Sequence, residues 1–198
     1  MGNVNAPKRE EILNESLKLF VQKGFNHTAV REITEATGLS KAAFYWHFSS
    51  KDELLMIILD KYESSYVDGV SAALKATKGN FLQKFKYMHK WTAEFAYNNR
   101  DLCVGFTTMA AEIAGSGTII ESKIRDIQNK HRGFLKKLLL LGRKEDKIRD
   151  DLDLNLMVHV IAVIYESMLI EWYSHRNDID GSKFAKTYRE IALSGILK

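Results

Sequence analysis

Residues 28–54 read TAVREITEATGLSKAAFYWHFSSKDEL, and this stretch decides the fold of the first part of the chain. Residues 29–37 and 41–47 have the apolar spacing of short helices, and Gly38-Leu39-Ser40 separates them. Glycine often follows a helix because it adopts the left-handed conformation, and serine often caps the helix that comes next. The pattern therefore predicts a helix-turn-helix, in which a tight turn joins two short helices.

Helical segments flank this motif on both sides. A helix over 8–23 is predicted from its apolar face and from the glycine that follows it. A long helix over 51–77 is predicted to begin with Lys51-Asp52-Glu53, where acidic residues suit the positive end of the helix dipole. Thr28 and Ser40 have the side chains expected at the N-caps of the two short helices.

The remainder of the chain is also predicted to be helical. The only proline is Pro7, and no run of alternating apolar and polar residues indicates a strand. The expected fold is all-α, with a three-helix domain at 1–50 and a helical bundle at 51–198. Beyond residue 80, helices are expected at 81–97, 101–114, 118–141, 153–176 and 182–197.

The composition is that of a globular protein, with 45% hydrophobic and 27% charged residues and a net charge of +4. The single cysteine, Cys103, allows no intrachain disulfide, and residues 1–11 lack the apolar stretch of a signal peptide. These features favour the cytoplasm. The most apolar segment, 156–173, contains His159, Glu166 and Glu171, so we expect a buried helix there and no membrane span.

An ordered set of short motifs carries a resemblance to a known family. Gly24-Phe25, Gly38-Leu39-Ser40, Phe44-Tyr45-Trp46-His47-Phe48 and Lys51-Asp52-Glu53-Leu54 together resemble the N-terminal part of the TetR family of transcriptional repressors. The resemblance covers residues 8–60, with small departures at Ala29, Thr34 and Ala42. It implies that 1–50 is a DNA-binding head and that 51–198 binds an effector and dimerises.

The second helix of such a motif enters the major groove of double-stranded operator DNA with its N-terminal residues near base edges. A lysine there can donate to guanine, and alanine methyl groups can contact the thymine methyl. Tyrosine, tryptophan and histidine farther along can donate to phosphates, and the start of the following helix offers a cation beside backbone N–H groups. Phe44 and Phe48 are expected in the core. The candidate DNA-binding residues are Thr28, Arg31, Ser40, Lys41, Ala42, Ala43, Tyr45, Trp46, His47 and Lys51.

Aromatic residues and methionines are frequent on the middle helices, and such side chains line apolar pockets. Together with the resemblance, they predict a site for a small apolar or aromatic effector. Plain core packing is the alternative explanation for many of them. The candidate pocket residues are Tyr62, Tyr66, Met88, Trp91, Phe95, Phe106, Met109, His159 and Tyr165.

The last two predicted helices carry more apolar residues than packing within one chain requires. Two such pairs can close a symmetric four-helix interface, so we expect a homodimer that binds a palindromic operator. The candidate interface residues are Ile161, Ile164, Met168, Trp172, Phe184, Tyr188 and Ile191.

Two other functions remain open at the level of the sequence. One is a dimeric DNA-binding protein that responds to no effector. The other is a helical enzyme, although the sequence contains no HExxH, CxxC, P-loop or GxSxG motif. We therefore expect no catalytic residue, no metal site and no cofactor.

Overall fold

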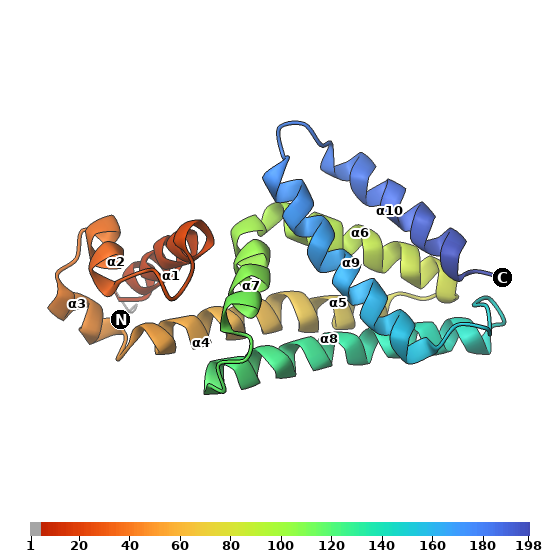
Figure 1. Ribbon diagram of the computed structural model, residues 1–198, viewed down its shortest axis with the longest axis horizontal. Helices are drawn as coiled ribbons and strands as arrows, with labels where there is room; N and C mark the ends of the chain where they lie inside the picture. Colours follow the sequence, from red (N-terminus) through yellow and green to blue (C-terminus); the bar gives the residue numbers. More distant parts are fainter. Residues whose placement is uncertain (1–4) are drawn as a thin grey trace. The chain divides into compact units, whose positions relative to one another are not determined.

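The computed structural model describes residues 5–198, and in this range it confirms the all-α class (Figure 1). The only β-type pairing among the described residues is an isolated bridge between Ile148 and Leu197. The elements are α1 (Asn5–Lys23), α2 (Val30–Thr37), α3 (Lys41–His47), α4 (Lys51–Tyr62), a π-helix η1 (Glu63–Asp68), α5 (Gly69–Ala76), α6 (Phe81–Asn98), α7 (Arg100–Ile113), α8 (Ile119–Lys144), α9 (Leu154–Ser174) and α10 (Gly181–Ile196).

The chain forms two compact units. Among the described residues, unit 1 contains 5–62 and 101–125, and unit 2 contains 63–100 and 126–198. This division differs from the boundary predicted at residue 50, because α4 and α7 belong to the same unit as the helix-turn-helix.

In unit 1, α1 packs against α2 and α4, and α2 packs against α3. The apolar face of α1 is buried as its spacing predicts, with Ile12 and Phe20 fully inside. Phe44 and Phe48 are also buried, which confirms them as core residues. Each of these aromatic side chains contributes about 2–3 kcal/mol through removal of apolar surface from water. This packing fixes α3 on the unit and leaves its other face exposed.

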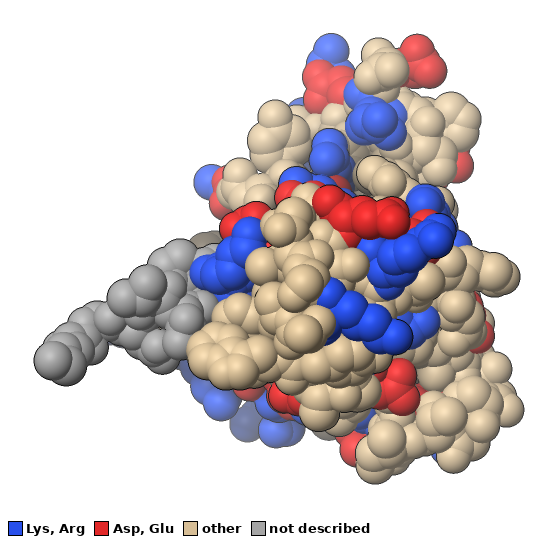
Figure 2. Space-filling model, turned by 90° about the vertical axis from the view of Figure 1, so that its left-hand side faces the viewer, with Lys and Arg blue, Asp and Glu red and all other residues tan. Residues whose placement is uncertain are grey.

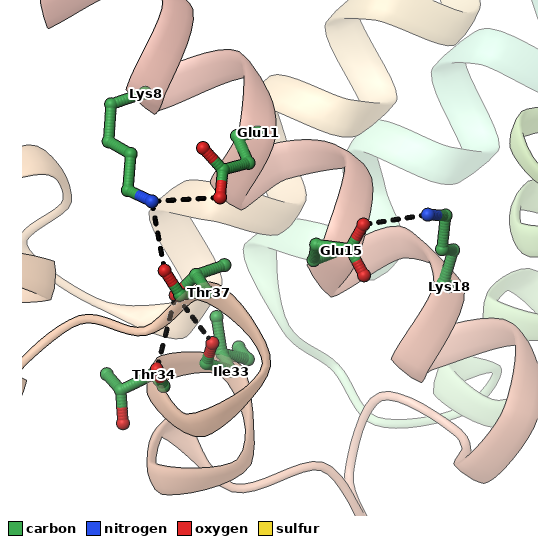
Figure 3. A network of polar contacts seen from close by, with 7 residues as sticks. All are labelled: Lys8, Glu11, Glu15, Lys18, Ile33, Thr34 and Thr37. Atoms are coloured by element: carbon green, nitrogen blue, oxygen red, sulfur yellow. Dashed lines mark hydrogen bonds and ion pairs between the residues drawn. The ribbon is translucent and has the colours of Figure 1, made fainter.

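A lysine ties α2 to α1 (Figure 3). Nζ of Lys8 on α1 donates to the carbonyl oxygen of Thr37 at 2.9 Å and to Oε1 of Glu11 at 2.8 Å. Thr37 is the last residue of α2, so its carbonyl has no donor within the helix. The Thr37 hydroxyl donates in turn to the carbonyl oxygen of Ile33 at 2.8 Å. Polar contacts therefore satisfy backbone carbonyl groups at the C-terminal end of α2, just before the turn.

The N-cap of α3 is the predicted residue, but the N-cap of α2 is not. Ser40 caps α3, since its Oγ accepts from Ala43 N at 3.1 Å, and Gly38 is left-handed with φ 65°. Thr28 does not cap α2. The N-cap is Ala29, whose backbone N–H donates to Glu32 Oε2 at 2.8 Å, while the Thr28 hydroxyl donates to the Gly24 carbonyl at 2.7 Å.

The predicted helix over 51–77 is not one regular α-helix. It is α-helical to Tyr62, π-helical over Glu63–Asp68 and α-helical again to Ala76. The boundary between the two units also falls between Tyr62 and Glu63. A π-helical turn accommodates an extra residue in the helix and is uncommon in proteins.

In unit 2, α5 packs against η1 and α6, and α10 packs against α6 and α9 (Figure 1). The hydrophobic core lies among these helices and α8. At one position on α8, a glycine lets side chains of this core lie close to the helix backbone. A Cβ at Gly142 would lie 2.6 Å from Ile148 Cδ1 and 2.8 Å from Phe81 Cγ. The buried core residues of this unit include Val70, Phe81, Phe85, Met88, Leu135, Leu139, Val158 and Ile161.

The most apolar predicted segment forms α9, but the expectation that this helix is buried is wrong for most of it. Only 22% of its most apolar 18-residue window is buried within the chain. By length and composition, α9 is the one helix among residues 5–198 that could cross a membrane, a weak indication by itself. One face, with Met157, Val158 and Ile161, lies in the core of unit 2, while Leu156 and Val160 are exposed.

Candidate nucleic-acid interface

The outer face of α3 presents polar and aromatic groups to solvent. Lys41, Ala42, Tyr45 and Trp46 are exposed, the last two by 46% and 66%. Nζ of Lys41 lies 6.0 Å from the centre of the Tyr45 ring, at the limit for a cation–π contact. The predicted contacts Arg31 and Ser40 are also exposed, whereas Ala43 and His47 are half-buried.

Exposed aromatic side chains of this size are unusual on a free surface. The Trp46 ring packs edge-on against His47, with centroids 4.7 Å apart. Together with Tyr45, these rings offer one O–H and several N–H donors beside the lysine. This combination suits a phosphate backbone, where donors and cations contribute most of the affinity.

Net charge does not distinguish this surface. Residues 1–62 contain eight Lys or Arg and eight Asp or Glu. Figure 2, which faces the end of unit 1 that carries α2 and α3, shows Lys and Arg side chains spread between acidic ones. Affinity for a nucleic acid would therefore depend on where individual cations lie, with Arg31 and Lys41 the exposed cations of α2 and α3.

The structure contradicts two of the predicted DNA contacts. Thr28 is 1% exposed, and its hydroxyl is used by the Gly24 carbonyl. Nζ of Lys51 donates to the carbonyl oxygens of Phe25 and Thr28 at 2.6 and 3.0 Å, and it lies 4.2 Å from the centre of the Phe25 ring. Desolvation lowers the pKa of Lys51, opposed by Asp52 and Glu112. Thr28 is buried and Lys51 is half-buried, and both side chains are hydrogen-bonded to carbonyl groups at the loop between α1 and α2.

A carboxylate from α7 holds the same loop from the other side. Glu112 accepts from the backbone N–H groups of Phe25 and Asn26, both at 2.7 Å. It also touches Gly24, whose φ of 88° favours glycine and where a Cβ would lie 3.1 Å from the carboxylate. No sequence pattern pointed to Glu112, because 86 residues separate it from Asn26.

Glu53 fixes the start of α4. Its Oε2 accepts from the backbone N and the Oγ of Ser49, both at 2.6 Å, and its own backbone N–H donates to Ser50 Oγ at 3.0 Å. These hydrogen bonds from Ser49 lower the pKa of Glu53. The sequence did contain the signal, since Ser50-x-x-Glu53 has the spacing of a capping box.

The predicted pocket residues fall into both units. In unit 1, Tyr62 stacks on Phe106 with centroids 3.9 Å apart, and Met109 is fully buried. His159 is exposed on α9 and lines no interior, so its assignment to a pocket is wrong. The other five predicted residues, which lie inside unit 2, are Tyr66, Met88, Trp91, Phe95 and Tyr165.

Inside unit 2, Tyr66 on η1 is the centre of an aromatic cluster. Its ring lies 5.4 Å from Phe95, 5.6 Å from His131 and 6.1 Å from Trp91. Burial lowers the pKa of His131 to about 4, with a further contribution from Arg132, so this histidine is neutral at pH 7. The cluster is aromatic and uncharged, a surface suited to an apolar or aromatic group.

A second group in unit 2 is polar. Nδ1 of His89 on α6 and the Tyr165 hydroxyl on α9 are hydrogen-bonded at 2.7 Å, and Nε2 of His89 contacts the carbonyl oxygen of Ala185. The Tyr188 ring on α10 lies 5.4 Å from His89 and 5.3 Å from Tyr165. The sequence did not single out His89, and among the described residues no group of three or more His, Cys, Asp or Glu could hold a metal ion.

Two of the predicted dimer residues lie inside the chain. Ile161 belongs to the core of unit 2, and Tyr188 lies between α6 and α9. Ile191 is exposed, and the remaining predicted residues Ile164, Met168, Trp172 and Phe184 are half-buried. The most exposed apolar residues of α9 are Leu156, Val160 and Val163, at 65%, 56% and 51%.

Comparison with known proteins agrees with this architecture. Residues 12–56 match the family model described as bacterial regulatory proteins, tetR family. The chain is 28% identical over 204 residues to the HTH-type transcriptional repressor KstR2 of Mycobacterium tuberculosis, an alignment that covers 100% of this chain and 96% of that protein.

Solved structures show the same fold over nearly the whole chain. The MbdR regulator from Azoarcus sp. CIB superposes with a TM-score of 0.87 at 24% identity, covering 95% of this chain and 98% of that one. The regulator FadR from Bacillus subtilis, solved in complex with stearoyl-CoA, superposes with a TM-score of 0.76 at 17% identity, covering 94% and 98%.

Proposed function

The chain belongs to the TetR family of bacterial regulatory proteins, and from that premise we propose that it is a repressor that holds operator DNA through α3 and releases it when a small ligand binds unit 2. It is a transcriptional regulator and not an enzyme, as the sequence predicted. The observation that carries the proposal is the exposed face of α3 within residues 12–56, the segment that matches the family model.

We assign the contacts with DNA by exposure. Lys41, Ala42 and Ala43 begin α3 and would lie nearest the base edges, where lysine donates to guanine. Tyr45, Trp46 and His47 would donate to phosphates, with Arg31 reaching from α2. Thr28 and Lys51 are proposed to act indirectly, because their hydrogen bonds stabilise the loop between α1 and α2.

The effector is proposed to be mostly apolar. The aromatic cluster around Tyr66 supports this, and so does the fatty acyl ligand that the Bacillus subtilis regulator holds. An acyl-CoA thioester is therefore the first class to test. Because a regulator must reach DNA, the cytoplasm remains the predicted location.

Members of this family bind operator DNA and dimerise. For this chain, we propose that the second copy covers the exposed face of α9 (Leu156, Val160 and Val163) and Ile191 on α10. A two-fold dimer would impose a palindromic operator with half-sites about 34–36 Å apart, one turn of DNA.

Selection of genomic DNA fragments with the purified protein tests the DNA-binding part. We expect enrichment of one palindrome, with affinity that falls steeply as salt rises because phosphate contacts release counterions. Tyr45→Phe, which removes one hydroxyl, should weaken binding to all sequences by about 1 kcal/mol, whereas Lys41→Ala should relax the preference at one base position. Enrichment of no sequence would contradict the proposal.

Titration of the protein with stearoyl-CoA, in the presence and in the absence of the selected operator, tests whether the ligand releases the DNA. Linkage requires the ligand and the operator to weaken each other by the same factor. Equal affinities in the two titrations would exclude induction by this ligand. If neither acyl-CoA thioesters nor apolar and aromatic compounds weaken operator binding, an effector-independent dimeric regulator is the remaining candidate function.

A further inference from the structure

The hydroxyl group of Tyr188 is the unexplained feature of unit 2. Tyr188 is 7% exposed, and its Oη is buried with no hydrogen-bond partner among the described residues. Leaving such a group unpaired is unfavourable, and buried hydroxyls usually find a partner. Burial raises the pKa of Tyr188 to about 12, so the hydroxyl keeps its proton and is available as a donor.

The neighbours of Tyr188 are hydrogen-bonded to one another, and none of them lies within hydrogen-bond distance of its Oη. The carbonyl oxygen of Ala185 can only accept, so Nε2 of His89 donates to it. Neutral His89 then has Nδ1 as an acceptor, which the Tyr165 hydroxyl occupies as donor at 2.7 Å. Desolvation lowers the pKa of His89 and favours this neutral form.

The charge of this group limits what can bind beside it. His89 is neutral, and the nearby Arg189 is paired with Glu190 at 2.9 Å. A buried carboxylate or phosphate would therefore lack a free counter-charge, which is costly in the interior of a protein. A neutral oxygen that accepts one hydrogen bond is the group that fits.

Apolar surface continues from this polar group. The Tyr165 ring lies 5.3 Å from Tyr188, and Tyr165 packs against the same hydrophobic core as Trp91, a member of the aromatic cluster. An effector with an apolar body and one carbonyl could contact both groups within the same unit.

We propose that Tyr188 is the polar anchor of the effector site and that its hydroxyl donates a hydrogen bond to a neutral carbonyl oxygen of the ligand, in a ketone or a thioester. The proposal rests on the proposed function, because it places the recognition group in the unit that is assigned to the effector. It moves Tyr188 from the predicted dimer interface to the ligand.

The test uses ligand pairs that differ only in the carbonyl group. The pairs are stearoyl-CoA with the thioether S-octadecyl-CoA, and 2-acetylnaphthalene with 2-ethylnaphthalene, titrated into the full chain and into Tyr188→Phe. We expect Tyr188→Phe to bind the carbonyl member of a pair about tenfold more weakly, the effect of one lost hydrogen bond. Its affinity for the carbonyl-free member should not change.

Thermal unfolding of the ligand-free protein separates this role from a structural one. Tyr188→Phe removes a hydroxyl without a partner, so its Tm should stay the same or rise. Tyr165→Phe, the matched variant, leaves Nδ1 of His89 without its donor and should lower Tm. A fall in Tm for Tyr188→Phe would show that the hydroxyl has a partner within the chain and would overturn the proposal.

The ligand titrations can also overturn it. If Tyr188→Phe lost equal affinity for both members of a pair, the cause would be altered packing and not a lost hydrogen bond. If the natural full chain bound neither carbonyl compound, the proposed ligand class would be excluded. Selection of an operator by the same preparation is measured independently. If no operator is selected, the proposed function is rejected. If an operator is selected but the ligand pairs do not show the expected difference, only the role of Tyr188 as the polar anchor is rejected.

Discussion

At the scale of single residues, the two lysines of the helix-turn-helix have opposite surroundings. Lys51 donates to two loop carbonyls, whereas Lys41 is exposed at the start of α3. We predict that Lys51→Met lowers the free energy of unfolding by about 1–3 kcal/mol, because it leaves part-buried carbonyl groups unpaired. Lys41→Met should leave stability unchanged and reduce operator affinity.

Urea unfolding and operator titration of the two variants check this pair. If Lys51→Met reduced operator affinity at unchanged stability, Lys51 would be a phosphate contact after all, as the sequence had suggested.

His131 makes the stability of the protein depend on pH. Its pKa is lowered by burial to about 4 in the folded state, below about 6.5 in the unfolded chain, so the unfolded chain binds the proton more tightly. The contribution of His131 is therefore complete above pH 6.5 and is lost as pH falls toward 4. A difference of this size corresponds to about 3 kcal/mol.

We predict that His131→Phe, which keeps an aromatic ring but cannot titrate, loses less stability than the natural chain between pH 7 and pH 5. Urea unfolding at both pH values measures this, with the exposed His175→Phe as the control. Equal pH dependence in the natural chain and His131→Phe would contradict the assignment.

At the scale of elements, η1 is the irregular part of the helix that runs from Lys51 to Ala76. Lys130 on α8 binds both of its ends, with ion pairs to Glu63 at 2.6 Å and Asp68 at 2.8 Å. Because a π-helical turn contains one residue more than an α-helix needs, deletion of Ser64 should restore a continuous α-helix and keep the registers on both sides.

We therefore predict that the protein lacking Ser64 still folds. Deletion of Lys86, an exposed residue within the regular α6, should rotate one half of that helix by about 100° and unfold the unit. Circular dichroism and thermal unfolding of the two deletion variants measure the difference. Loss of cooperative unfolding in the Ser64 deletion would mean that the extra residue is required.

At the scale of the whole molecule, α9 exposes more apolar surface than a monomer usually leaves in water. We predict that Val160→Glu combined with Ile191→Glu gives a monomer, because a buried, unpaired carboxylate would be forced into the interface between copies. Light scattering should then report 22.7 kDa, and binding to the palindrome should fall.

Leu140→Glu is the matched control, since Leu140 is an exposed apolar residue on α8. It should remain dimeric. A dimer that persisted in the double variant would place the interface elsewhere.

Local sequence patterns were sufficient to predict the helix-turn-helix, the cap by Ser40, the buried Phe44 and Phe48 and the all-α class. These features depend on signals that act within a few residues, such as a glycine with positive φ or apolar residues at helical spacing. These local signals act in the same way whatever the segment packs against, so composition and spacing were sufficient to predict the features.

The tertiary structure alone decided where long side chains point. Lys51 turns toward the loop at Phe25, Glu112 holds that loop from α7, and Tyr188 faces the interior of unit 2. Each direction depends on partners that are distant in the chain. Burial and hydrogen bonding against those partners select one arrangement, because an unpaired polar group inside the protein costs more than the change of rotamer that avoids it.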